Sequence, residues 1–241
     1  MLDIQNLEKA FGSKRAVDGI SFTLEPGTVL GFLGPNGAGK STTMRMISGV
    51  LEPDTGDALI DGQSIVENRR IAQRNLGYLP EGAPLYNEMT PPQFLQFLAQ
   101  ARQLPRDDRK SAVERAIADA RISSVCKQRI GSLSKGYRRR VGLAGAILHD
   151  PPVLLLDEPT DGLDPNQKRA VRALISRMAP TKAILISTHT LTEVPAMCTR
   201  AVVVDKGRIV ADDTPSGLLE RSEDGTLESA FARLTDQNEA G

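Results

Sequence analysis

The feature that most constrains the fold is a glycine-rich segment between an apolar run and a helical pattern. The apolar run Val29–Leu33 leads directly into Gly34, Pro35, Asn36, Gly37, Ala38, Gly39, Lys40, Ser41 and Thr42. The order strand, G-x-x-x-x-G-K-[ST], helix predicts a phosphate-binding loop, in which backbone N–H groups curl around phosphate oxygens. We expect Lys40 to reach the β and γ phosphates of a nucleotide and the Ser41 hydroxyl to ligate Mg²⁺. A glycine-rich turn without a ligand would have no need of this Lys-Ser pair.

Further apolar runs predict that the loop belongs to an α/β fold. They are apolar at nearly every position, as in strands buried on both faces of a parallel sheet, and comprise Gly77–Leu79, Val153–Leu156, Ala183–Ser187 and Ala201–Val204. Helical patterns lie between them: Ser41–Ser48, a segment opened by Thr90-Pro91-Pro92, and Asp108–Arg121. A turn at Pro53–Gly56 is expected to follow the first helix.

Two other patterns indicate antiparallel strands. Near the N-terminus Leu2 and Ile4 alternate with polar neighbours, as do Ile20, Phe22 and Leu24, which predicts half-exposed strands. Asp205-Lys206-Gly207, between two β-branched runs, predicts a hairpin turn.

Composition limits the classes of partner. Thirty basic and thirty acidic residues give no net charge, so a global positive field for nucleic acid is not supported and we expect no nucleic-acid partner. The two cysteines, Cys126 and Cys198, lack metal-ligand spacing and are expected to be reduced thiols. We find neither a secretory signal pattern at the start nor an apolar run near the ~20 residues that cross a bilayer. Any role at a membrane therefore requires a partner.

Carboxylates and a histidine follow two of the predicted strands. Asp157 and Glu158 end one apolar strand, where Asp157 can hold Mg²⁺ through water and Glu158 can deprotonate an attacking water. His189 follows the next strand in Ser187-Thr188-His189. A single histidine is usually structural, but its place beside the phosphate loop favours a catalytic role.

Together these motifs resemble the ATP-binding cassette (ABC) ATPases. Leu133-Ser134-Lys135-Gly136-Tyr137 is similar to the family's signature, and Val153–Pro165 to its Walker B strand and D-loop. The resemblance implies a P-loop NTPase (RecA-like) core with an antiparallel β flank and an inserted helical subdomain. It also implies a single nucleotide-binding domain over 1–235, with the helical subdomain at about 88–150 and a disordered tail at 236–241.

The resemblance further implies a site shared between two chains. Phe11 matches the aromatic residue that stacks on adenine, and His189 the histidine that contacts the γ-phosphate. Ser134 and the Gly136 N–H match the signature groups that bind the γ-phosphate of ATP held by the other protomer. Asp164, in the D-loop, is expected across that dimer interface. The chain would then hydrolyse ATP with Lys40, Glu158 and His189 as catalytic residues.

Three positions depart from the family's usual motifs. Lys135 and Tyr137 replace a glycine and a glutamine of the signature, without touching the Ser134 hydroxyl or the Gly136 backbone. Glu81 stands where the Q-loop normally carries glutamine. A carboxylate only accepts hydrogen bonds, yet it can still join Ser41 and Asp157 around Mg²⁺.

The form of the segment from Gly77 to Tyr86 is similar to that of ABC-2-type exporter cassettes, and Thr226–Phe231 to their C-terminal helix. This resemblance implies an exporter subunit at the cytoplasmic face of the inner (plasma) membrane, below separate ABC-2-type permease subunits. Two alternatives are a soluble ATPase acting on ribosomes or DNA and a nucleotide sensor without hydrolysis. The single phosphate loop and signature argue against a ribosome-acting factor, which usually carries two cassettes, and the absence of heptads between them argues against a chromosome or repair ATPase. The presence of Glu158 argues against a sensor without hydrolysis. Whether the dimer partner is a second copy or a similar cassette stays open, as does the cargo.

Overall fold

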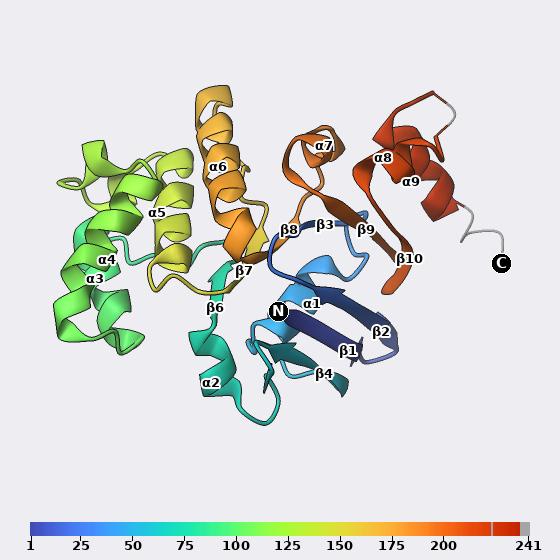
Figure 1. Ribbon diagram of the computed structural model, residues 1–241, viewed down its shortest axis with the longest axis horizontal. Helices are drawn as coiled ribbons and strands as arrows, with labels where there is room; N and C mark the ends of the chain where they lie inside the picture. The colour runs from blue at the N-terminus through green and yellow to red at the C-terminus, as the bar shows by residue number, and fades with distance from the viewer. Residues whose placement is uncertain (223, 237–241) are drawn as a thin grey trace.

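The computed structural model describes residues 1–222 and 224–236, whose strands form two sheets (Figure 1). The strands of the larger sheet are β3 (Val29–Leu33), β6 (Leu76–Leu79), β7 (Val153–Asp157), β8 (Ala183–Ser187), β9 (Arg200–Asp205) and β10 (Arg208–Asp213). Their order is β10-β9-β3-β8-β7-β6, with β10 antiparallel to β9 and the other neighbours parallel. The predicted α/β fold is confirmed, and the expected strand boundaries are within one residue of those observed.

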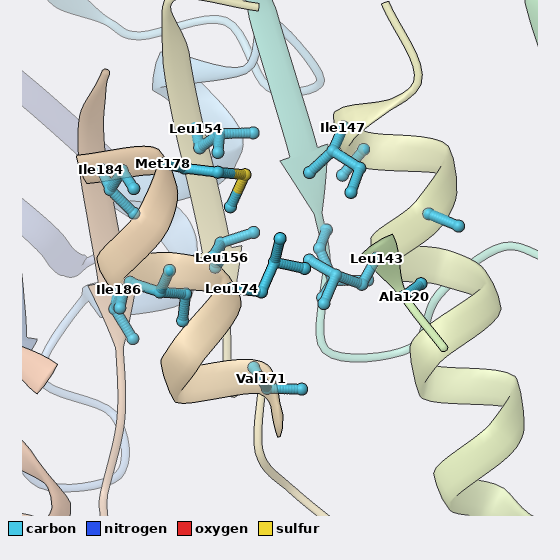
Figure 2. Close-up of a cluster of buried hydrophobic side chains, with 14 of the residues drawn as sticks. Ala120, Leu143, Ile147, Leu154, Leu156, Val171, Leu174, Met178, Ile184 and Ile186 are labelled. Carbon is cyan, nitrogen blue, oxygen red and sulfur yellow. The ribbon is translucent and has the colours of Figure 1, made fainter. Parts of the chain in front are cut away.

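The apolar runs form a parallel sheet because both of its faces are covered. Along β7, Leu154 and Leu156 belong to a buried cluster on one face and Leu155 to a cluster on the other. Figure 2 shows the first cluster, where strand side chains meet α6 (Pro165–Met178) and α5 (Lys135–Ile147). Full burial of each such side chain contributes about 1.5–3 kcal/mol. The sheet is therefore a rigid base for the loops at the carboxyl ends of its strands.

The smaller sheet is antiparallel and contains the predicted N-terminal strands. It comprises β1 (Leu2–Phe11), β2 (Lys14–Leu24), β4 (Thr55–Ile60) and β5 (Gln63–Ser64), in the order β2-β1-β4-β5. Leu2, Ile4 and Phe22 are buried, whereas Gln5 is exposed. The alternation of apolar and polar residues thus corresponds to strands with one buried and one exposed face, as predicted. The hairpin turn between β9 and β10 also lies where it was expected, at Lys206 and Gly207.

The turn predicted at Pro53–Gly56 ends earlier than expected, because β4 already begins at Thr55. Gly56 adopts a φ of 83°, and a Cβ atom there would lie 2.2 Å from the Asn6 carbonyl oxygen. The pairing of β1 with β4 shifts register at this point. A glycine here therefore belongs to a bulge in a strand, not to a turn.

The helices α3 (Pro91–Ala101), α4 (Arg106–Asp119) and α5 lie together at one end of the molecule, and α8 (Pro215–Leu219) and α9 (Leu227–Asp236) lie at the other (Figure 1). Thr90 and Gln93 form the capping box that begins α3. The remaining helices are α1 (Lys40–Ile47), α2 (Arg69–Arg74) and α7 (Val194–Met197), with short 3₁₀ turns at Ser123–Val125, Ile130–Ser132, Ala179–Thr181 and Leu191–Glu193. Of the tail expected at 236–241, Asp236 ends α9 and residues 237–241 lie outside the described residues.

Candidate nucleotide site

The glycine-rich loop joins β3 to α1 and packs closely against two other strands. A Cβ atom at Gly39 would lie 2.4 Å from the Ala16 carbonyl oxygen of β2, and one at Gly34 would lie 2.4 Å from the Val204 carbonyl oxygen of β9. Gly39 also has a φ of 106°, in the left-handed region that glycine adopts readily. The loop therefore packs so closely against β2 and β9 that a side chain at either position would clash with a strand carbonyl oxygen.

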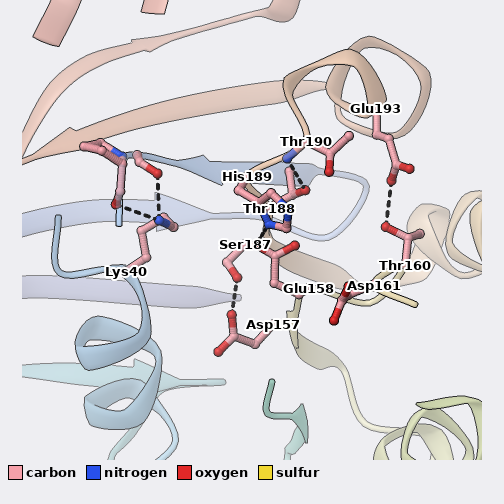
Figure 3. Close-up of polar contacts among 12 residues, drawn as sticks. Lys40, Asp157, Glu158, Thr160, Asp161, Ser187, Thr188, His189, Thr190 and Glu193 are labelled. Atoms are coloured by element: carbon pink, nitrogen blue, oxygen red, sulfur yellow. Dashed lines mark hydrogen bonds and ion pairs between the residues drawn. The ribbon is translucent and has the colours of Figure 1, made fainter. Parts of the chain in front are cut away.

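Lys40 begins α1, and its side chain folds back across the loop (Figure 3). The ammonium donates hydrogen bonds to the carbonyl oxygens of Gly34, at 2.7 Å, and Pro35, at 3.0 Å. Burial lowers the pKa of Lys40, whereas three nearby carboxylates raise it, those of Glu158, Asp157 and Glu81. The fold thus brings the phosphate-loop lysine close enough to the predicted acidic residues for their charges to interact.

An open hollow of about 280 Å³ lies over the loop. Its walls are Phe11, Lys14, Ala16, Asn36, Gly37, Gly39, Lys40, Ser41 and Thr42. Phe11, at the end of β1, is 53% exposed and therefore is not a core residue. An exposed aromatic ring beside a phosphate loop is well placed to stack on a nucleotide base.

Asp157 ends β7 beside the end of β8. The parallel register pairs it with Ser187, whose hydroxyl donates a hydrogen bond to Asp157 Oδ1. Asp157 is only 4% exposed, so its charge lies inside the site. In open α/β sheets ligands bind at the carboxyl ends of the strands, which is where this carboxylate lies.

Glu158, the next residue, has a left-handed backbone with a φ of 51°. Its N–H donates to the Ser187 carbonyl oxygen at 3.0 Å, and its own carbonyl oxygen accepts from Arg139 Nη2 at 2.8 Å. In this conformation its carboxylate meets His189, with Glu158 Oε1 at 2.7 Å from His189 Nδ1. The peptide of Glu158 is therefore held on both sides while its side chain contacts the histidine.

The electrostatics of this pair suit a proton acceptor. Burial raises the pKa of Glu158, and the hydrogen bond from His189 opposes the rise. An ionised carboxylate only accepts, so His189 Nδ1 carries the proton between them. The His189 side chain is 63% exposed and that of Glu158 is 13% exposed. A carboxylate with a raised pKa is a stronger base once ionised, which is what activation of water requires.

Glu81 follows β6 and is held through its backbone. Arg139 Nη1 donates to the carbonyl oxygens of Pro80, at 2.6 Å, and Glu81, at 2.8 Å, while the Glu81 side chain is exposed. A second hollow, of about 270 Å³, lies here; its walls are Glu81, Gly82, Ala83, Leu85, Leu133, Lys135, Arg138, Arg139 and Asp161. Arg139 thus fixes the backbone at Glu81, while the Glu81 carboxylate faces the solvent.

The signature segment begins α5. Ser134 is the N-cap, and its hydroxyl accepts a hydrogen bond from the Tyr137 N–H at 3.4 Å. A Cβ atom at Gly136 would lie 2.6 Å from Gln167 Oε1 of α6 and 3.3 Å from the Gly162 carbonyl oxygen, so α5 packs closely on this neighbouring segment. The unusual Lys135 forms an ion pair of 2.8 Å with Asp161.

The D-loop residue Asp164 has a structural contact of its own. Its carboxylate accepts the Gln167 N–H at 2.9 Å and thereby caps α6. Ser134, Gly136 and Asp164 do not line the hollow over the phosphate loop. The residues expected to contact ATP therefore form two separate groups within one chain.

Two features of the site were not predicted from the sequence. The first is the buried Arg139, although its place beside the apolar positions Leu143 and Ala146 of the same helix was a signal of burial. The second is Glu193, which accepts from Thr160 Oγ1 at 2.6 Å and from Lys168 Nζ at 2.8 Å. No sequence spacing connects these groups, which link the segment after Glu158 to the segment after His189 (Figure 3).

Within residues 1–222 and 224–236 no three or more His, Cys, Asp or Glu side chains are grouped to hold a metal ion. Magnesium at a phosphate site usually keeps waters and phosphate oxygens and needs only one or two protein ligands, so the Ser41 hydroxyl and the Asp157 carboxylate fit this manner of binding. No helix in the same residues is long and apolar enough to cross a membrane. Cys126 and Cys198 are both free thiols, as expected.

Comparison with known proteins places this geometry in a family. Residues 17–161 match the family described as ABC transporter. The chain is 37% identical over 220 residues to "Nod factor export ATP-binding protein I" of Burkholderia pseudomallei (strain 1710b), covering 91% of this chain and 72% of the relative.

Solved structures agree with this match. One described as the ATP-binding subunit of an ABC transporter superposes with a TM-score of 0.87 at 28% identity, over 97% of this chain and 99% of the other. The dimeric structure of MJ0796, a bacterial ABC transporter cassette, superposes with a TM-score of 0.81 at 20% identity, over 89% of this chain and 99% of the other. The chain belongs to the ABC transporter family and is an ATP-binding, ATP-hydrolysing subunit of such a transporter.

Proposed function

We propose that this subunit works as a dimer in which each ATP lies between the phosphate loop of one chain and the signature segment, Leu133–Tyr137, of the other. The observation that carries this proposal is the separation, within one chain, of the hollow over Lys40 from the hollow beside Lys135. Ser134 is exposed, and because its oxygen accepts from Tyr137, its O–H can donate to a phosphate oxygen. The dimeric form described for MJ0796 supports this arrangement.

Within the composite site, Glu158 accepts a proton from the attacking water as the bond between the γ-phosphorus and ADP breaks. Lys40 offsets charge on the β and γ phosphates, and His189 orients Glu158 and contacts the γ-phosphate. Ser41, Asp157 and Glu81 would hold Mg²⁺, which would neutralise charge on the phosphates. Across the interface, Ser134 and the Gly136 N–H contact the γ-phosphate, and Asp164 faces the partner chain.

We further propose that the subunit drives export through ABC-2-type permease subunits at the cytoplasmic face of the plasma membrane. A hollow of about 730 Å³ is the candidate docking site for such a subunit. Four arginines line it, namely Arg45, Arg70, Arg74 and Arg102. Pro80 and Gly82 line it too, on either side of Glu81, so a partner docked there would act on the segment that carries this carboxylate. The export function in the name of the Burkholderia relative supports the direction of transport.

The composite site is tested by mixing two inactive variants. A Lys40→Ala chain and a Ser134→Arg chain are each expected to lack turnover as homodimers, because both of their sites are broken. Mixed in equal amounts they form one complete site in each mixed dimer, about a quarter of the wild-type number of sites. The measurement is phosphate release at increasing ratios of the two chains.

A matched pair provides the control. Lys40→Ala mixed with Glu158→Gln should restore nothing, because Lys40 and Glu158 act on the same ATP from the same chain. Recovery in the first mixture and not in the second supports the composite site. Equal recovery in both mixtures, or recovery in neither, would count against it.

A further inference from the structure

Arg139 is a buried cation that joins three segments of the molecule. It lies in α5, just after the signature, and is 6% exposed. One end of its guanidinium, Nη1, donates to the Pro80 and Glu81 carbonyl oxygens, and the other, Nη2, donates to the Glu158 carbonyl oxygen. A single side chain thus ties α5 to the segment after β6 and to the residue after β7.

The contact with Glu158 bears on a residue in an uncommon conformation. A left-handed φ in a residue other than glycine costs about 1–3 kcal/mol and persists only where the surroundings enforce it. Two backbone contacts enforce it here, since Ser187 accepts the N–H of Glu158 and Arg139 binds its C=O. The backbone of Glu158, held at its N–H and at its C=O, carries the carboxylate that contacts His189.

The shape of the guanidinium matters as much as its charge. Its planar fork reaches two segments at once, which a lysine ammonium on a flexible stem cannot reproduce. Its partners are neutral carbonyl groups, and the compensating negative charge comes from four surrounding carboxylates: Asp157, Asp161, Glu158 and Glu81. Arg139 is therefore close enough to these carboxylates to feel their charge, without forming an ion pair with any one of them.

We propose that Arg139 is a positioning residue for ATP hydrolysis, holding the peptide of Glu158 and the Glu81 segment in a fixed relation to the signature helix. This inference rests on the proposed role of Glu158 as the base. In this proposal Arg139 acts through the backbone of Glu158, whose carbonyl oxygen it binds. Displacing a reacting group by about 1 Å can cost on the order of 10²-fold in rate, so loss of the fork should affect turnover more than binding.

The next residue along the chain supplies a matched control. Arg140 is 7% exposed, and its Nη1 donates at 2.9 Å to the carbonyl oxygen of Arg121, which lies just beyond α4. Both arginines also have a buried Nε atom without a partner in the described structure. Arg140 also lies over the ring of Tyr137, 4.2 Å from its centroid, so it supports the signature segment but binds no carbonyl oxygen of Glu81 or Glu158. It therefore matches Arg139 in burial and in its place in α5 while lacking those contacts.

The experiment compares Arg139→Met and Arg139→Lys with Arg140→Met and Arg140→Lys. For each variant, kcat, MgATP affinity and thermal midpoint are measured on the full chain. We expect Arg139→Met to lower kcat by about tenfold to a hundredfold with MgATP affinity within about threefold, and Arg139→Lys to recover part of the rate. The Arg140 variants should lose thermal stability to a similar extent while kcat stays within about threefold.

Two further measurements separate positioning from folding. Adding millimolar guanidinium to Arg139→Ala should restore part of kcat, because the ion can occupy the vacated space between the carbonyl groups. Adding Arg139→Met to a Glu158→Gln chain should cause little further loss, because two residues that act as one unit are not additive.

The inference is overturned if Arg139→Met folds and keeps its kcat, or if kcat falls equally in the Arg140 variants. It is also overturned if the decreases in kcat caused by Arg139→Met and by Glu158→Gln multiply in the double variant. If Arg139→Met does not fold, Arg139→Lys and the guanidinium rescue decide the question by the same criteria. Near-normal turnover in Glu158→Gln alone would instead reject the base assignment, whatever the Arg139 variants show.

Discussion

Replacing Glu158 by Gln removes the basicity of one side chain while keeping its size. A positioned general base contributes about 10²–10⁴-fold to a rate, equivalent to about 3–5 kcal/mol of the barrier. The carboxylate lies 2.7 Å from His189 Nδ1, and a glutamine oxygen can accept the same hydrogen bond. We therefore expect turnover to fall at least about a hundredfold while MgATP binding is retained or strengthened, because a negative charge near the γ-phosphate is removed.

The assay is phosphate release at saturating MgATP, alongside calorimetric titration with MgATP. Near-normal turnover in Glu158→Gln would reject Glu158 as the base and favour His189 in that role. Loss of MgATP binding together with turnover would show that the carboxylate maintains the structure of the site.

The pH profile provides an independent check on the same residue. Burial raises the pKa of Glu158, and the ionised form is the active one, so activity should fall with decreasing pH earlier than for an ordinary carboxylate. His189 lowers the pKa of Glu158 through its hydrogen bond. When the pH is lowered, the residual activity of His189→Ala should therefore begin to fall at a higher pH than that of the wild type. A shift in the opposite direction would contradict the pairing of these two residues.

Three further variants test other parts of the site. Lys40→Ala should abolish tight MgATP binding, and unchanged affinity by calorimetry would contradict the phosphate-loop assignment. Phe11→Ala should weaken ATP binding by about 1–3 kcal/mol, the size of a base–aromatic stack, with little change in thermal midpoint because the ring is exposed; unchanged affinity would remove the stacking role. Glu81→Gln should keep ATPase activity within about tenfold, since either side chain offers an oxygen to the metal; a collapse of activity would show that the negative charge is required.

Elements with a strong local signal were predictable. The strands around Val153–Asp157 and Ala183–Ser187 are apolar at almost every position because both faces are covered, and this pattern is visible without any tertiary information. The phosphate loop was equally predictable, because one short motif gives both the order strand, loop, helix and the place of Lys40 at the start of that helix.

What escaped prediction depends on contacts between distant segments. The early start of β4 arises because Gly56 lies against the carbonyl of Asn6, in a bulge that exists only when the two strands pair. The fork of Arg139 joins carbonyl groups that are 58, 59 and 19 residues away in the chain. Pattern and spacing describe neither contact, because each partner is a backbone oxygen that carries no sequence signal.

The central claim, that ATP joins two chains in complementary sites, is tested most directly by the mass of the Glu158→Gln chain in solution. Light scattering after size-exclusion chromatography, with bound nucleotide counted, should give a two-chain mass carrying two ATP in MgATP and a one-chain mass in MgADP. The Ser134→Arg, Glu158→Gln chain should bind MgATP and stay at the one-chain mass. A Glu158→Gln chain that is saturated with MgATP yet keeps the one-chain mass at every protein concentration would contradict the account.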